Sequence, residues 1–78
     1  MNDIPALRSA IDELDDQLIN LIRHRARLSA AIQEQRVREG GHRKSLPREG
    51  QILDRYHAAL EAPGVAVARA LLVLCRGH

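Results

Sequence analysis

Two arginines in the first half of the chain have the residue type and the spacing to bind an anion. Arg25 and Arg36 are eleven residues apart, which on a helix is three turns, so both project from nearly the same face about 16 Å apart. Ser29 and Ile32 lie on that face and supply a small and an apolar wall. A guanidinium is permanently charged and grips carboxylate or phosphate with two parallel bonds. The spacing therefore predicts a site for a small oxyanion.

Two more arginines and a glutamate extend this candidate site. Arg48 and Glu49 follow a short loop at the start of a second predicted helix, where the helix N-terminus adds attraction for an anion. Arg8 is different, because it lies about 25 Å from Arg25 along the helix axis. The two cannot touch one small ligand within a single chain, but in an antiparallel dimer the Arg8 region of one chain would run past Arg25 of the other.

These arginines also have plainer interpretations. Arg25 could pair with an aspartate of a neighbouring chain and fix the register of two helices; the candidates are Asp12, Asp15 and Asp16. Arg36 and Arg38 could be solvated charges favoured by the helix dipole. Eleven of the twelve basic residues are arginine, a bias that either oxyanion recognition or codon usage could produce.

The sequence offers little sign of other chemistry. The four histidines have no metal-ligand spacing, and Cys75 lies in an apolar run, which is typical of a small buried hydrophobic residue. No glycine-rich phosphate loop or nucleophile elbow is present. We therefore expect no metal and no cofactor.

One long helix is expected to carry most of the candidate site. Apolar residues recur at alternating spacings of four and three from Ile4 to Ile32, with Arg25 in one stripe position, and we define the apolar stripe as Ile4, Leu7, Ile11, Leu14, Leu18, Leu21, Leu28 and Ile32. Asp3 and Pro5 provide a start signal, and Gly40 and Gly41 a stop. A helix over 4–38 would be a rod of roughly 50 Å, acidic in its first half and basic in its second. That charge polarity predicts an antiparallel homodimer.

Two shorter helices are expected after this rod. A basic loop from Gly40 to Leu46 precedes a second helix that Ser45 caps and that runs to about Ala62. Pro63 and Gly64 break the chain, and the apolar segment 65–75 is predicted to be a buried helix. The predicted fold is all-α, with one long and two short helices.

Length and composition point to one small domain over residues 1–78. The chain has no Phe or Trp and only one Tyr, so its core holds little apolar area, and oligomerisation is the expected support. One cysteine, and no signal peptide or membrane span at the N-terminus, predict a soluble cytoplasmic protein that does not enter a membrane. Nucleic-acid binding is disfavoured, because the basic half has no aromatic residue and the net charge is only +2.

Two stretches of the sequence resemble the all-α chorismate mutase family, in particular its short subclass from actinobacteria. They are LRSAIDELDDQLINLIRHRARLSAAI and GGHRKSLPREGQILDRY. The similarity covers residues from about Ile4 to Tyr56 and is weaker beyond. Its most specific parts are the LR-x-x-ID-x-LD start, the R-x-R spacing before Ser29, the Gly-Gly loop and the Arg-Glu pair that follows it.

The resemblance implies an intertwined homodimer that rearranges chorismate, a dicarboxylate enol ether, to prephenate in aromatic amino-acid biosynthesis. Arg8 matches an arginine that the partner chain supplies to the site, Arg25 the central carboxylate-binding arginine, and Arg36 the cation directed at the breaking ether oxygen. Arg48 matches a further substrate-contacting arginine, and Glu49 the carboxylate close to the ring hydroxyl. The subclass also implies a complex with DAHP synthase.

Two loop residues depart from the family pattern. His42 stands where the short subclass has a small polar residue, and Ser45 where it has an aliphatic one, so both are candidate substrate contacts. Larger members place a glutamine in the third helix near the ether oxygen. Here the corresponding segment has only Arg69, Cys75 and Arg76 beside its apolar residues.

Two other functions remain open from the sequence. One is a same-fold enzyme acting on a chorismate analogue, either a 4-amino-4-deoxychorismate mutase or an isochorismate pyruvate-lyase. The other is a non-catalytic helical dimerisation module whose arginines only make ion pairs.

Overall fold

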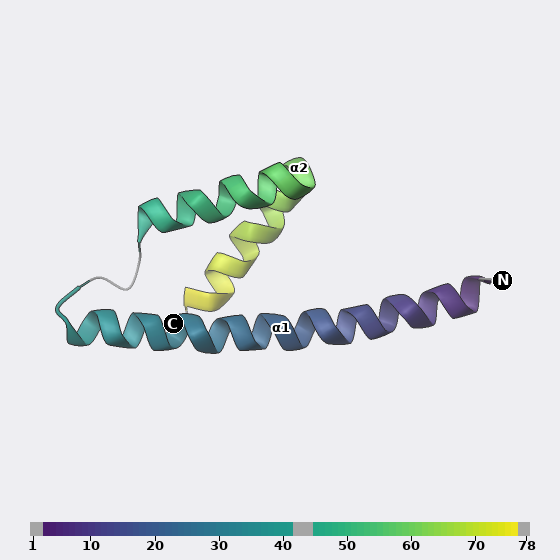
Figure 1. The fold of residues 1–78 in the computed structure, drawn as a ribbon, viewed down its shortest axis with the longest axis horizontal. Helices are drawn as coiled ribbons and strands as arrows, with labels where there is room; N and C mark the ends of the chain where they lie inside the picture. The colour runs from purple at the N-terminus through teal and green to yellow at the C-terminus, as the bar shows by residue number, and fades with distance from the viewer. Residues whose placement is uncertain (1–2, 42–44, 77–78) are drawn as a thin grey trace.

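The computed structural model describes residues 3–41 and 45–76, and these residues form two helices and no strand. Helix α1 spans Ile4–Arg38 and helix α2 spans Leu46–Arg76 (Figure 1). The predicted all-α class is confirmed. The predicted long helix has the bounds that its start and stop signals indicated.

Capping residues explain both ends of α1. The Asp3 carboxylate accepts a hydrogen bond of 2.8 Å from the backbone N–H of Ala6, which satisfies a donor that the first turn leaves free. At the other end Gly40 has φ 82°, a backbone conformation that glycine adopts without strain. The N–H groups of Gly40 and Gly41 then donate to the carbonyls of Val37 and Arg36, at 3.0 and 2.7 Å, in the paired pattern of a Schellman cap.

The prediction of three separate helices is confirmed only in part. The second and third predicted helical segments are both present, but they follow each other without a loop and form α2, which turns sharply between them. The chain turns within one residue, Glu61, whose φ of 61° and ψ of −153° are not helical. Pro63 lies early in the following helical segment, where a missing N–H costs little. We call residues 46–60 the first arm and residues 62–76 the second arm of α2. The segment 65–75 is helical, as predicted.

The two arms fold back over the second half of α1, so that the end of the second arm meets α1 near Gln33, in the last third of the rod (Figure 1). The small core consists of Ile52, Ala68, Leu71 and Cys75, all from α2. Gly64 is also buried at the kink. A Cβ atom at Gly64 would lie 2.5 Å from the carbonyl oxygen of Tyr56, so the close packing of the two arms requires a glycine there.

The apolar stripe of α1 stays exposed in the single chain. Each of its eight residues is between 46% and 64% exposed, and the molecule is 57 Å long but only 24 and 16 Å across. A stripe this long and this apolar is unusual on a free surface. It is the surface that the predicted homodimer would cover.

By length and composition, α2 is long and apolar enough to cross a membrane, with a mean hydropathy of 1.7 over its most apolar window. The core helix of a soluble protein meets the same criterion. The kink at Glu61 divides α2 into arms of fifteen residues, whereas a straight span needs about 20. Neither arm alone reaches that length.

Candidate active site

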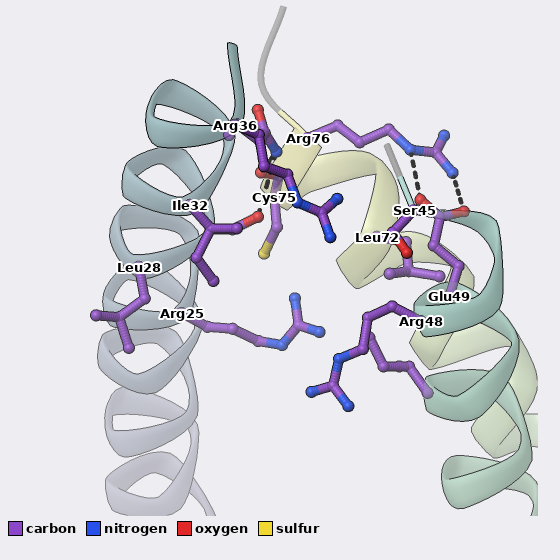
Figure 2. Close-up of a pocket in the computed structure, with 13 residues that line it drawn as sticks. Arg25, Leu28, Ile32, Arg36, Ser45, Arg48, Glu49, Leu72, Cys75 and Arg76 are labelled. Atoms are coloured by element: carbon purple, nitrogen blue, oxygen red, sulfur yellow. Dashed lines mark hydrogen bonds and ion pairs between the residues drawn. The ribbon is translucent and has the colours of Figure 1, made fainter. Parts of the chain in front are cut away.

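A pocket of about 230 Å³ lies where the second half of α1 meets both ends of α2. Figure 2 shows the side chains that face it from three directions: α1, the first turn of α2 and the last turn of α2. The lining residues are Arg25, Leu28, Ser29, Ile32, Gln33, Arg36, Ser45, Arg48, Glu49, Ile52, Leu72, Cys75 and Arg76.

A polar line on α1 forms one wall. Arg25, Ser29, Gln33 and Arg36 follow one another at spacings of four, four and three, which places them on one helix face. Arg25 and Arg36 are half-buried, and both guanidinium groups point toward the space between the helices (Figure 2). The predicted convergence of these two arginines on one pocket is therefore present in the fold.

The first turn of α2 forms the facing wall. The carbonyl of Ser45 accepts the N–H of Glu49 at 3.0 Å, so the helix begins directly after Ser45 as predicted. This start brings Arg48 and Glu49 to the pocket, and Arg48 points across it toward Arg25 (Figure 2). The positive end of the helix dipole lies at the same place and favours an anion.

Glu49 is the one pocket carboxylate among the described residues, and it is paired. Arg76, from the last turn of α2, donates to both of its oxygens, with Nη2 at 2.7 Å from Oε1 and Nε at 3.2 Å from Oε2. The Glu49 side chain is 16% exposed and that of Arg76 is 38% exposed. This two-bond geometry fixes both side chains in one orientation.

Gln33 ties the end of α2 to α1. Its side-chain nitrogen donates to the carbonyl of Cys75 at 3.0 Å and to the hydroxyl of Ser29 at 3.3 Å. Gln33 is buried, with 9% exposure, and burial in a low-dielectric setting strengthens such bonds. Gln33 therefore lines the pocket and also joins two of its walls, α1 and the end of α2.

The charges in the pocket favour an anionic ligand. Across residues 3–41 and 45–76, Arg25, Arg36 and Arg48 make no ion pair with a carboxylate. Three guanidinium groups that face one small space repel one another, and an anion between them relieves that repulsion. Apolar side chains of Leu28, Ile32 and Leu72 complete the wall, as expected for a ligand with an organic body.

Two predicted site residues are not in this pocket. Arg8 lies on the exposed first half of α1, which α2 does not cover (Figure 1). His42 falls outside the described residues. The structure thus brings together Arg25, Arg36 and Ser45 with the pair Arg48 and Glu49, and their roles toward a ligand stay predictions.

Gln33 and Arg76, the two pocket residues whose side chains hydrogen-bond to another wall of the pocket, were not predicted as site residues. Gln33 continues the face of Arg25 and Ser29 by one further turn, so the helical period contained a signal for it. Arg76 had no comparable signal, because its approach to Glu49 depends on the kink at Glu61. Within the described part of the chain, no group of three or more His, Cys, Asp or Glu side chains is placed to hold a metal ion.

A hollow of about 270 Å³ continues from the pocket along the first arm of α2. It shares Arg25, Arg48 and Ile52 with the pocket and adds Tyr56 and Leu60 among its lining residues. The pocket and this hollow therefore adjoin each other at Arg25 and Arg48.

The fold and the pocket define a class of protein: an all-α protein with an arginine-lined pocket between its helices. The sequence model of chorismate mutase type II matches residues 7–72 of this chain, a range that includes every pocket residue except Cys75 and Arg76. The chain belongs to the chorismate mutase type II family.

Similar proteins are known in mycobacteria. The chain is 40% identical over 76 residues to the intracellular chorismate mutase of Mycolicibacterium smegmatis, covering 97% of this chain and 73% of that protein. It is 39% identical to the intracellular chorismate mutases of Mycobacterium tuberculosis and Mycobacterium bovis, covering 71% of each. No solved structure gives a significant match.

Proposed function

We propose that this protein is an isomerase that rearranges chorismate to prephenate, the step that leads toward aromatic amino acids. Membership of the family supports this reaction. The observation that carries it in this chain is the set of three guanidinium groups from two helices, Arg25, Arg36 and Arg48, that face one pocket without a carboxylate partner among the described residues.

The reaction needs only positioning and charge stabilisation. It is unimolecular: the ether C–O bond of chorismate breaks while a C–C bond forms, with no proton transfer and no covalent intermediate. The enzyme must hold the flexible dicarboxylate in a compact shape and stabilise the negative charge that grows on the ether oxygen. Arginine suits both tasks because its charge is permanent and its donors are fixed in a plane.

The resemblance to the family implies a role for each residue, and the position of each residue in the pocket is compatible with that role. Arg25 and Arg48 face each other across the pocket (Figure 2) and would grip the carboxylates. Arg36 would direct its charge at the breaking ether oxygen, and Glu49 would accept a hydrogen bond from the ring hydroxyl. Ser45, at the start of α2, would contact the same end of the ring.

A second copy of the chain would complete the site. The exposed apolar stripe of α1 supports an antiparallel homodimer in which Arg8 of one chain reaches the pocket of the other. The hollow beside Arg25 and Arg48 provides a path for such an approach. Because the stripe residues are 46–64% exposed, burying each of them would contribute about 1 kcal/mol, which a chain with so small a core needs.

Two further parts of the proposal concern the cellular setting. The mycobacterial relatives are named intracellular, which supports a cytoplasmic location for this protein. The resemblance to the short subclass supports a complex with DAHP synthase that raises the turnover of chorismate. Assays with and without the cognate DAHP synthase test this complex, and equal rates would contradict it.

The reaction itself is tested by following the loss of chorismate absorbance in the ultraviolet with the purified protein. The proposal predicts that prephenate appears at the rate at which chorismate disappears. Consumption of 4-amino-4-deoxychorismate or release of pyruvate from isochorismate, with chorismate left intact, would favour a related enzyme. If neither chorismate nor these analogues raises the melting temperature, a dimerisation module is favoured.

A further inference from the structure

Arg76 connects the last turn of α2 to its first turn across the edge of the pocket. Its guanidinium approaches the Glu49 carboxylate with the two bonds of 2.7 and 3.2 Å described above. Figure 2 shows the Arg76 side chain running over the pocket from the side of Cys75 to the side of Ser45. The other charged side chains of the pocket come from α1 and from the start of α2, so Arg76 is the charged group that the end of α2 contributes.

The backbone that carries Arg76 is itself fixed. Cys75 is only 4% exposed, and its carbonyl accepts the 3.0 Å hydrogen bond from Gln33 of α1. Arg76 therefore projects from a helix end that is anchored to the opposite wall. An anchored base limits the orientations that its side chain can sample, so the pair with Glu49 is well defined.

The charge distribution gives this pair a consequence for ligand binding. Four arginines line the pocket, and Glu49 is the one carboxylate there among the described residues. A glutamate on a long side chain, next to three guanidinium groups, would be attracted to them. Any arginine that Glu49 engaged would be lost to a substrate carboxylate. Arg76 holds Glu49 from the pocket edge and leaves Arg25, Arg36 and Arg48 available.

We propose that Arg76 is a positioning residue that keeps the Glu49 carboxylate aimed at the ring end of the substrate and away from the other pocket arginines. This role rests on the function proposed above. It makes Arg76 a determinant of substrate affinity without a contact to the reacting atoms. It also assigns a use to the end of α2, a region outside the residues that match the family model.

A purely structural role for the Arg76–Glu49 pair predicts different properties of the variants. In that case Arg76 would only join the two ends of α2, and its loss would lower the melting temperature and reduce activity whether or not Glu49 is present. In the positioning role, the damage done by losing Arg76 comes from a Glu49 that has lost this ion pair and turns toward the arginines that bind the substrate. When Glu49 is removed as well, the loss of Arg76 must then have no further effect on substrate affinity beyond that of removing Glu49 alone.

The test compares KM and kcat for chorismate in the full chain and in five variants. Arg76→Gln removes the charge, Arg76→Lys keeps it without the two-bond geometry, Glu49→Gln removes the carboxylate, and one variant combines Arg76→Gln with Glu49→Gln. Arg69→Gln is the matched control, because Arg69 is an exposed arginine two turns earlier on the same arm. Melting temperatures are measured for all of them.

The expected result is a KM raised about tenfold or more by Arg76→Gln, a smaller rise with Arg76→Lys, and no change with Arg69→Gln. The double variant should have the KM of Glu49→Gln alone. The role is overturned if Arg76→Gln leaves KM unchanged, or if the KM of the double variant lies well above that of Glu49→Gln and its melting temperature is lowered.

A measurement independent of turnover separates this role from the proposed reaction. The Nε–H resonance of Arg76, assigned by its loss in Arg76→Gln, should lie apart from those of exposed arginines and move to their position in Glu49→Gln. If the unmodified protein does not turn over chorismate, the proposed reaction is refuted. The spectrum then still tests whether Arg76 and Glu49 form an ion pair in solution. A resonance that does not respond to Glu49→Gln overturns the pair itself.

Discussion

Replacement of Arg36 by alanine should separate activity from stability. Arg36 lies in the last turn of α1, is half-buried and points into the pocket. It makes no ion pair with a carboxylate of the described residues. The fold therefore gains little from its charge, whereas the proposed transition state depends on it.

Arg36→Ala should have a large effect on kcat and a small effect on the stability of the fold. Loss of one preorganised donor aimed at a developing oxyanion costs about a hundredfold to a thousandfold in kcat, or about 3–4 kcal/mol in the barrier. Loss of a cation from the last turn of a helix costs about 0.3–1 kcal/mol of stability. Relief of repulsion from Arg25 and Arg48, and the higher helix propensity of alanine, offset part of that. We expect the melting temperature to change by less than about 5 °C.

The assay is chorismate turnover with a parallel melting curve, and Arg38→Ala is the matched control. Arg38 lies in the same last turn, but its ion pair with Glu34 at 3.0 Å is on the surface, with both side chains about 70% exposed. Such a pair contributes about 0.5 kcal/mol, so Arg38→Ala should keep normal turnover. Near-normal turnover of Arg36→Ala, or equal losses in the two variants, would refute the role assigned to Arg36.

Three further substitutions test the fold and the dimer. Glu61→Gly should raise the free energy of unfolding by about 1 kcal/mol, because Glu61 occupies a backbone region that strains any side chain; a lower midpoint in urea would show that the kink is not strained. Gly64→Ala should lower it by about 2 kcal/mol, since the new Cβ would lie 2.5 Å from the Tyr56 carbonyl oxygen, and an unchanged midpoint would contradict the close packing of the arms. Leu14→Glu, in the stripe at 55% exposure, should weaken the dimer at least a hundredfold in sedimentation experiments, and an unaltered sedimentation coefficient would mean that the stripe is not the interface.

Local signals were sufficient to predict the long helix. Its bounds depend on Asp3 at one end and on Gly40 and Gly41 at the other, and each of these acts on the backbone within a few residues. The heptad spacing predicted which side of α1 is apolar. The grouping of Arg25 and Arg36 followed from the helical period alone, because one straight helix carries both.

Features that depend on packing between segments could not be predicted in the same way. The sequence indicated a break at Pro63 and Gly64, whereas the chain turns at Glu61, a residue type with no preference for positive φ. That turn lets the second arm return to α1 and places Arg76 beside Glu49. The contacts of Gln33 with Cys75 also join residues 42 positions apart, so no local pattern contains them.

The claim that two chains share one arginine-lined site is tested most directly by a heterodimer of two inactive chains. Arg8→Ala and Arg36→Ala should each reduce chorismate turnover at least a hundredfold as homodimers. A heterodimer isolated with two different affinity tags would contain one site with both arginines intact and one with neither, so two-fold symmetry predicts about half of the activity of the unmodified dimer. A heterodimer no more active than its parents would contradict the shared site.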